Sequence, residues 1–312
     1  MLVSVIIPTR NCRTSLAATL EAILGQHLEG GFEVIVVDNG SEDGTAELAA
    51  SFPSPVRVIG GPNRGPAAAR NRGAAEAAGD LFAFTDGDCI PQPDWLAAGV
   101  AACGSADLVQ GRVRPVLGAP FGPFDRSIWV ESELGLYETA NLFVRRRLFE
   151  RVGGFEAWFE ATADRPFGED TWLGWRLRRA GARTAYCAEA LVEHAVLPGN
   201  ARSMIAERAR VGQFAGLVEL VPELRETLLF ARIFLTRRSA AFDLALTGLA
   251  LARMTRSRSP LAGVLPYAVV ALRRAARWRR RGPAVLAAEV AADVIGCASL
   301  LTHSVRRGTP VL

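Results

Sequence analysis

Two aspartates separated by one glycine, Asp86 and Asp88, follow a short apolar segment. Carboxylates two residues apart in an extended segment can point to the same side. A pair of hard oxygen ligands suits Mg²⁺ or Mn²⁺, and the oxygens of a bound diphosphate would complete the coordination shell. Because Asp-Gly is also a common turn sequence, a structural loop is the alternative interpretation.

His194 is a candidate third ligand for the same ion, together with Asp86 and Asp88. An imidazole nitrogen is a frequent metal ligand, and Glu193 could orient the ring. A histidine after an apolar segment is more often a buried structural residue, which is the alternative here.

A second acidic pair, Glu169 and Asp170, opens a stretch with helical spacing. We interpret Asp170 as a general base that removes the proton from an attacking hydroxyl, with Glu169 beside it in the catalytic site. Acids in a first helical turn also favour the positive end of the helix dipole, which is the structural alternative.

Asp38 ends an apolar segment and could accept hydrogen bonds from a nucleobase or a ribose. It could instead only cap the next helix. Arg70 lies in an alanine-rich stretch that begins after Gly65, and its guanidinium could reach a phosphate. A solvent-exposed arginine on a helix surface is the alternative.

These residues lie where strands are expected to end. Short apolar runs alternate with stretches of helical spacing, which predicts an α/β fold with a mostly parallel sheet flanked by helices. Ligands bind beyond the carboxyl ends of such strands, so the polar clusters should converge at one edge. The predicted strands are 3–7, 33–37, 56–59 and 81–85, and the predicted helices are 14–25, 43–51 and 66–78.

The composition fits a chain with a sizeable core, since half of the 312 residues are hydrophobic and 22% are charged. Net charge changes near Pro198, from −7 before it to +11 after it. We therefore expect a domain at 1–200 and a helical, arginine-rich tail at 201–312. An acidic domain with a basic tail argues against nucleic acid as a partner and suits an anionic surface. Oligomeric state has no sequence signal.

The tail carries apolar stretches beside a cluster of six arginines at 273–281. This pattern predicts helices that lie in a membrane interface, with the arginines on anionic headgroups. A helical cap on the first domain is the alternative. Glu289 and Asp293 disfavour a true membrane span at 284–301. The scattered cysteines and the lack of a signal peptide predict a cytoplasmic protein, peripheral on the inner face of the plasma membrane.

Six segments in order resemble the family 2 glycosyltransferases, which have the GT-A fold. They are VSVIIPTRN (3–11), VIVVDNGSEDGT (34–45), NRGPAAARNRG (63–73), FTDGDC (84–89), NLFVRRRLFERVGGF (141–155) and GEDTWLGWRLRRAG (168–181). The resemblance implies a metal-dependent, inverting transfer of a sugar from a UDP- or GDP-sugar to a glycan or lipid-linked acceptor at the membrane.

The resemblance also implies a role for individual residues. Asp88 and His194 would bind the metal with Asp86, and Asp170 would be the base. Gly154 and Phe155 would lie in the acceptor region. Trp172, in the stretch with helical spacing, could form a platform for the acceptor, and a packing residue is the alternative. The residues expected to bind the nucleotide-sugar are Pro8, Thr9, Arg10, Asp38, Gly65, Arg70 and Asp86.

The chain departs from the family pattern at Asn39, where a second aspartate is usual, and it has no QxxRW motif, the mark of processive synthases. We therefore expect the addition of one or a few sugars. The alternatives are a nucleotidyltransferase that makes sugar nucleotides and a non-catalytic membrane scaffold with a decayed site. The first would need a basic, glycine-rich phosphate loop that Thr9-Arg10-Asn11 does not provide.

Overall fold

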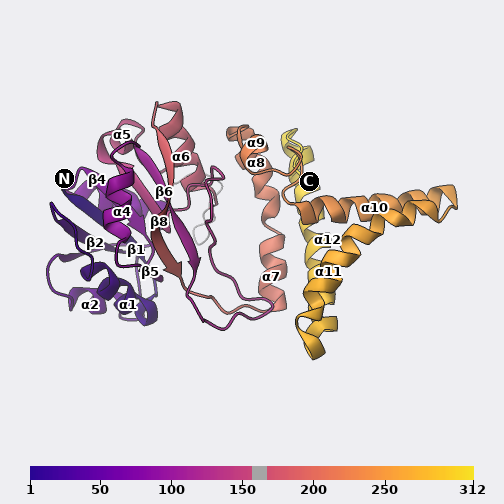
Figure 1. Cartoon of the computed structure of the whole chain (residues 1–312), viewed down its shortest axis with the longest axis horizontal. Helices are drawn as coiled ribbons and strands as arrows, with labels where there is room; N and C mark the ends of the chain where they lie inside the picture. Colours follow the sequence, from indigo (N-terminus) through magenta and orange to yellow (C-terminus); the bar gives the residue numbers. More distant parts are fainter. Residues whose placement is uncertain (157–166) are drawn as a thin grey trace. The chain divides into compact units, whose positions relative to one another are not determined.

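A computed structural model describes residues 1–156 and 167–312 of the chain. Contacts divide these residues into two compact units (Figure 1). The first unit comprises Met1–Pro120 and Ser127–Val196, and the second comprises Phe121–Arg126 and Leu197–Leu312. The first is built on a sheet, and the second is helical.

The sheet of the first unit has eight strands in the order β3-β2-β1-β4-β7-β6-β8-β5. Strands β3, β2, β1 and β4 are parallel, and β7 is antiparallel to β4 and β6. Strand β8 is parallel to β6, and the short β5 is antiparallel to β8. The strands are β1 (Val3–Thr9), β2 (Phe32–Asp38), β3 (Val56–Gly60), β4 (Leu81–Thr85), β5 (Cys89–Pro91), β6 (Leu108–Pro115), β7 (Asn141–Arg145) and β8 (Thr184–His194).

Helices cover both faces of this sheet. The apolar face of α1, with Leu16 and Leu20, shares one buried cluster with Val5 and Ile7 of β1. The predicted α/β fold, with its mostly parallel sheet, is thus confirmed, and the four predicted strands and three predicted helices are present. The helices are α1 (Arg13–Leu24), α2 (Thr45–Ala50), α3 (Pro66–Glu76), α4 (Trp95–Ala102), α5 (Arg146–Arg151) and α6 (Glu169–Arg179).

Helix α3 packs very closely on the opposite face of the sheet. A β-carbon at Gly73 would lie 2.6 Å from Ile6 Cγ2 and 2.9 Å from Val37 Cγ2. Only glycine fits this contact without movement of the sheet. One turn earlier, Arg70 is buried on the same helix, so the close packing of α3 brings its guanidinium to the carboxyl edge of the sheet.

We expect Gly73→Ala to destabilise the chain by at least about 1 kcal/mol, because the added methyl group overpacks the contact with Ile6. The gain in helix propensity offsets only part of this cost. The measurement is the midpoint of thermal unfolding. Gly60→Ala is the matched control, since a β-carbon at Gly60 meets nothing within 4 Å. An equal midpoint for the two variants would contradict the prediction.

The second unit consists of helices, of which α10, α11 and α12 contact one another. Phe242, Tyr267 and Ala271 form the centre of its apolar cluster. The helices are α7 (Ala201–Arg208), η1 (Val211–Gln213), α8 (Phe214–Leu220), α9 (Leu224–Thr227), α10 (Arg237–Thr255), η2 (Ser259–Val264), α11 (Leu265–Ala276), η3 (Arg279–Arg281) and α12 (Gly282–Arg307). Among the described residues, one continuous helical stretch, Arg279–Arg307, is long and apolar enough to cross a membrane.

The two acids of α12, Glu289 and Asp293, point inward. Asp293 accepts a hydrogen bond of 2.7 Å from Arg238 and one of 2.8 Å from the Tyr267 hydroxyl. Glu289, which is buried, pairs with Arg238 at 3.1 Å and with Arg274. Because Glu289 and Asp293 are paired inside the unit, they do not place charge on the outer surface of α12.

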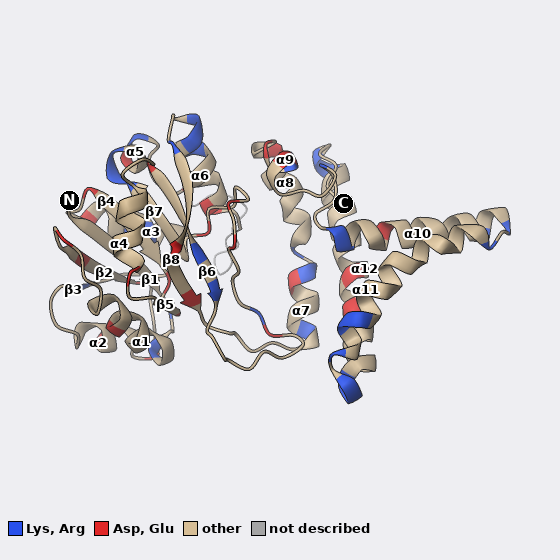
Figure 2. Cartoon of the chain, viewed as in Figure 1, with Lys and Arg blue, Asp and Glu red and all other residues tan. Residues whose placement is uncertain are grey.

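Most residues along α10, α11 and α12 are uncharged, and arginines gather near the helix ends (Figure 2). The exposed large apolar side chains on these helices are Leu244, Leu246, Leu249, Leu251, Met254, Leu265, Val269, Val270, Leu272, Val294, Leu301 and Val305. Helix α12 therefore pairs its two acids inside the unit, while large apolar side chains of α10, α11 and α12 are exposed.

Candidate active site

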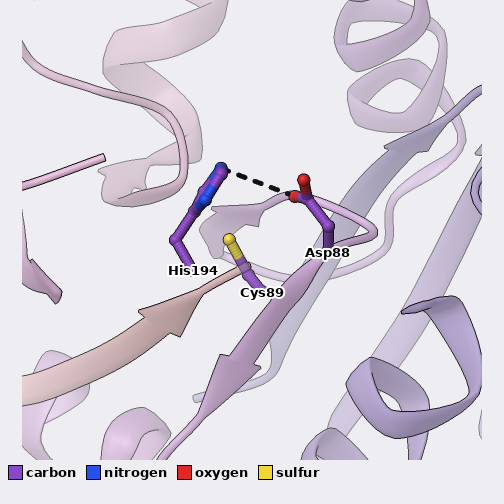
Figure 3. Close-up of side chains that lie close together, drawn as sticks. All are labelled: Asp88, Cys89 and His194. Atoms are coloured by element: carbon purple, nitrogen blue, oxygen red, sulfur yellow. Dashed lines mark ion pairs between the residues drawn. The ribbon is translucent and has the colours of Figure 1, made fainter. Parts of the chain in front are cut away.

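The two aspartates of the DGD segment lie in the loop between β4 and β5, at the carboxyl edge of the parallel strands. Strand β8 runs antiparallel to β5 and ends at His194, directly opposite Cys89. This pairing brings the His194 Nε2 atom to 3.6 Å from Asp88 Oδ1 (Figure 3). The structure thus brings together two of the three predicted metal ligands, with Asp86 two residues before Asp88.

The hydrogen bonds of His194 determine which ring nitrogen is free. Its Nδ1 atom lies 2.7 Å from the carbonyl oxygen of Ala195, which can only accept a hydrogen bond. In the neutral imidazole, Nδ1 therefore carries the proton, and the lone pair of Nε2 faces Asp88. Glu193, expected to orient this ring, instead pairs with Arg114 at 2.8 Å. The ring is oriented by the backbone.

This donor set fits a divalent cation. Two ligands of one ion with bonds of about 2.1 Å lie about 3.0 Å apart in octahedral geometry and about 3.4 Å apart in tetrahedral geometry. The 3.6 Å between Asp88 and His194 is close to these separations. Burial raises the pKa of Asp88; the histidine lowers it, and the charge of Asp86 raises it further. A bound cation would offset that accumulated negative charge.

Arg70 connects this loop to the start of α6. Its guanidinium donates a hydrogen bond of 2.8 Å to Asp86 and lies 3.5 Å from Glu169. The side chain is buried, and the ring of Phe155 lies 5.7 Å from the guanidinium carbon. Burial lowers the pKa of Arg70, but Asp86, Glu169 and Asp170 raise it by more, so its charge is held firmly. Its predicted contact with a phosphate stays a prediction.

Asp170 lies in the first turn of α6, after Gly168, whose φ of 78° allows the sharp entry into the helix. Desolvation raises its pKa well above the ordinary value, and the charges of Glu169 and Glu138 add to that rise. A hydrogen bond from the Thr171 backbone and the charge of Arg70 lower it in part. A carboxylate with a raised pKa is a stronger base, which is the property required of a residue that removes a hydroxyl proton.

Four of the predicted nucleotide-binding residues, Pro8, Thr9, Arg10 and Asp38, lie at the ends of β1 and β2. The Asn39 backbone N–H donates to the carbonyl of Thr9 at 2.9 Å, beside Pro8 and the exposed Arg10. Asp38 is buried; its Oδ2 accepts the Ser41 N–H at 3.2 Å. Its Oδ1 has no hydrogen-bond partner within the described part of the chain.

Asn39, where the family usually has aspartate, ties this loop to the residues before α3. Its amide donates to Asn63 at 2.9 Å, and its oxygen accepts the Arg64 N–H at 3.1 Å. Gly65, with φ of 85°, then leads into Pro66 at the helix start. The departure at Asn39 is therefore accommodated by two local hydrogen bonds.

The residues predicted for the acceptor region lie beside α3 and α6. The backbone N–H and carbonyl of Phe155 bond to Asn71 at 2.8 Å and 2.7 Å. Gly154 and Phe155 are both buried, whereas Gly153 just before them is exposed, so Gly153 is the residue of this turn that a ligand could reach. Trp172 is partly exposed, and its indole N–H donates to Glu156 at 3.0 Å.

Two residues of the site were missed from the sequence. Cys89 lies within the metal-ligand group, although the sequence pattern predicted no role in the site for any cysteine. Its position next to Asp88 was an available signal. Glu138 influences Asp170 electrostatically, and its own pKa is raised by burial to about 7. It lies in a loop whose sequence has no recognisable pattern.

Comparison with known proteins shows the family of the chain. The sequence profile described as glycosyl transferase family 2 matches residues 4–161, which is half of the chain. The chain belongs to this family. Glycosyltransferase AglE of Haloferax volcanii is 37% identical over 168 residues, covering 49% of this chain and 55% of that protein.

Other similarities are more distant. Pre-mycofactocin glycosyltransferase of Mycobacterium tuberculosis is 30% identical over 211 residues, 62% of this chain and 42% of that protein. The chain thus spans about half the length of these curated relatives. The structure of mannosyltransferase PcManGT from Pyrobaculum calidifontis, in complex with GDP-Man and Mn²⁺, has a TM-score of 0.63 at 22% identity, covering 95% of this chain and 86% of that one. Residues 1–349 of Staphylococcus aureus TarS, in complex with UDP-GlcNAc, give a TM-score of 0.52 at 16% identity, covering 99% and 93%. These structures share the GT-A fold.

Proposed function

We propose that this chain transfers a sugar, with inversion, from a UDP- or GDP-sugar to a hydroxyl of a glycan or lipid-linked acceptor, with Mn²⁺ or Mg²⁺. The observation that carries the proposal is the bridge made by Arg70. It ties Asp86, beside the cation ligands, to Glu169, beside the candidate base. One site would therefore hold both the cation with the donor's diphosphate and a group that can deprotonate an acceptor.

The residues divide the reaction between them. Asp38 would accept hydrogen bonds from the base of the donor, through the oxygen that lacks a partner. Asp88 and His194 would hold the cation, which when bound neutralises negative charge on the leaving diphosphate. Asp170 would take the proton of the acceptor hydroxyl as that oxygen bonds to the sugar carbon. Attack from the face opposite the leaving group gives inversion.

The direct test is a panel of UDP- and GDP-sugars with the full chain and Mn²⁺, read first as thermal stabilisation by each donor. A stabilising donor is then assayed for release of the nucleoside diphosphate with and without Mn²⁺. Metal-dependent release supports the proposal. Pyrophosphate release from a nucleoside triphosphate and a sugar phosphate would replace it with nucleotidyl transfer, and failure to bind any donor would favour a scaffold.

The influence of Glu138 on Asp170 predicts a shift in pH dependence. A general base acts when deprotonated, so the rate should fall as pH drops through the raised pKa of Asp170. Because the negative charge of Glu138 contributes to that rise, Glu138→Gln should lower the pKa of Asp170. The acid limb of the kcat profile should therefore move to lower pH. Desolvation remains the larger cause, so the limb should stay above the ordinary aspartate range.

Glu133→Gln is the control, because Glu133 accepts a hydrogen bond from Tyr137 in the same loop and is not among the main influences on the pKa of Asp170. An acid limb that stays in place in Glu138→Gln, or moves to higher pH, would exclude the electrostatic role.

We further propose that the second unit embeds its helices in the cytoplasmic face of a membrane. An apolar outer surface on α10, α11 and α12 is costly in water and favourable in lipid. Two acids that would oppose insertion, Glu289 and Asp293, are paired inside with Arg238 and Arg274. Arginines at the helix ends and Trp278 would lie at the headgroups.

Flotation of the full chain with lipid vesicles tests this proposal. We expect binding that survives high salt, since burial of leucines is not screened as charge attraction is. Changing Leu249 and Leu272, both exposed, to Glu should reduce binding strongly. Ser257→Glu, at an exposed polar position, is the control. If salt alone releases the unmodified chain, the contact with the vesicles is only electrostatic and the helices are not embedded. If the chain does not bind anionic vesicles at all, the proposal is wrong.

A further inference from the structure

The thiol of Cys89 belongs to the same group of side chains as the candidate cation ligands. Cys89 follows Asp88 and lies directly opposite His194 in the antiparallel pair of β5 and β8. Directly opposed residues of such a pair have their side chains on the same face of the sheet. One ligand atom each from Asp88, Cys89 and His194 lies within 4.8 Å of the others, and Figure 3 shows the three side chains gathered together.

These distances are close to those of a three-ligand metal site. In a tetrahedral zinc site with bonds of about 2.3 Å to sulfur and about 2.1 Å to nitrogen, those two atoms lie about 3.6 Å apart. Side-chain rotations that shorten the present separations by about 1 Å would suffice. No other group of three potential ligands gathers in this way within residues 1–156 and 167–312.

We propose that Cys89 is a third protein ligand of this cation site, and that its sulfur gives the site a preference for Zn²⁺ or Co²⁺ over Mg²⁺. The inference rests on the cation role given to Asp88 and His194 in the proposed function. Thiolate is a soft ligand, and imidazole suits the same transition metals, whereas Mg²⁺ favours oxygen alone.

Binding would exchange a proton for the metal. The S–H bond of Cys89 breaks, the sulfur donates its electron pair to the ion, and the proton leaves to solvent. Three protein ligands leave at least one coordination position for a water or a diphosphate oxygen, as in catalytic zinc sites. Zn²⁺ held in this way would compete with Mn²⁺ for the site.

Titration of the full chain with Co²⁺, without a donor, tests the ligand directly. A cobalt–thiolate bond gives a charge-transfer absorption in the near ultraviolet that oxygen and nitrogen ligands do not give. We expect the band in the unmodified chain, its loss in Cys89→Ser, and its retention in Cys103→Ser, which changes another buried thiol of the first unit. Zn²⁺ affinity should fall at least about tenfold in Cys89→Ser, since loss of even an outer-shell partner costs that much. Mn²⁺ affinity should fall less.

Absence of the band in the unmodified chain, or its persistence in Cys89→Ser, would overturn the proposal. If Cys89→Ser does not fold, the same cobalt titration is done on a variant in which Cys89 is the single remaining cysteine. Its four other cysteines, Cys12, Cys103, Cys187 and Cys297, are then changed to serine. Mn²⁺-supported transfer without a cobalt–thiolate band would refute the Cys89 ligand and leave the proposed function standing. A cobalt–thiolate band without transfer from any donor would support the Cys89 ligand and refute the proposed function.

Discussion

Asp170→Asn is expected to lower the rate of sugar transfer by about 10² to 10⁴, which is the usual contribution of a positioned general base. This corresponds to about 3 to 5 kcal/mol of activation free energy. The amide keeps the size of the side chain and can still accept the hydrogen bond from the Thr171 backbone. It cannot take up the proton of the acceptor hydroxyl. Donor binding should be unchanged, so the loss should appear in kcat.

Single-turnover kinetics at saturating donor, with calorimetric measurement of donor affinity, separate these two effects. Asp94→Asn is the matched control, because Asp94 is an exposed aspartate at the start of α4. Transfer retained in Asp170→Asn would remove Asp170 as the base. Loss of donor binding together with transfer would assign it a binding role.

Asp88→Asn should lower Mn²⁺ affinity by at least about 100-fold, because a neutral amide replaces a charged ligand in a site with only a few protein ligands. The remaining His194 nitrogen then faces a group that bonds the cation weakly. Donor affinity should fall in parallel when Mn²⁺ is present, since the metal is expected to connect the diphosphate to the protein. Donor binding without metal should change little.

Electron paramagnetic resonance of free Mn²⁺ measures the first effect, and donor titration with and without Mn²⁺ measures the second. Asp80→Asn is the control, because Asp80 is an exposed aspartate just before β4. Undiminished, metal-dependent turnover in Asp88→Asn would mean that this carboxylate is not a metal ligand. The two variants should thus fail differently, one in chemistry and the other in donor and metal binding.

Much of the first unit could be predicted from local patterns. Buried parallel strands are continuous apolar runs, so β1, β2 and β4 were recognised in this way. The partly exposed β3 was recognised by its valine and isoleucine residues. The rule that ligands bind beyond strand ends then predicted the edge where Asp86 and Asp88 lie. No local pattern identifies β7 as antiparallel, because that orientation depends on how the chain returns to the sheet.

The partners of Arg70 could not be predicted. Asp86 and Glu169 are 16 and 99 residues away from it, and only the packing of α3 on the sheet brings the three together. Sequence spacing gave Arg70 two interpretations, an exposed residue and a phosphate ligand, and neither included two carboxylates. Glu138 was missed for the same reason, since its effect on Asp170 depends on tertiary burial.

In the helical tail, prediction from sequence fails for a different reason. Glu289 and Asp293 count against membrane insertion in any composition argument, because the sequence does not show which way they point. The structure pairs both with Arg238. A charged residue in an apolar helix therefore argues for or against membrane insertion only when its pairing partners are known.

The buried guanidinium of Arg70 also constrains how this chain can change over generations. Replacing either Asp86 or Glu169 alone would leave a buried positive charge short of a partner, at a cost of several kcal/mol. Replacing Arg70 alone would leave two carboxylates repelling each other beside Asp170. These three distant positions should therefore be substituted together in evolution, and related chains should keep all three residues or none.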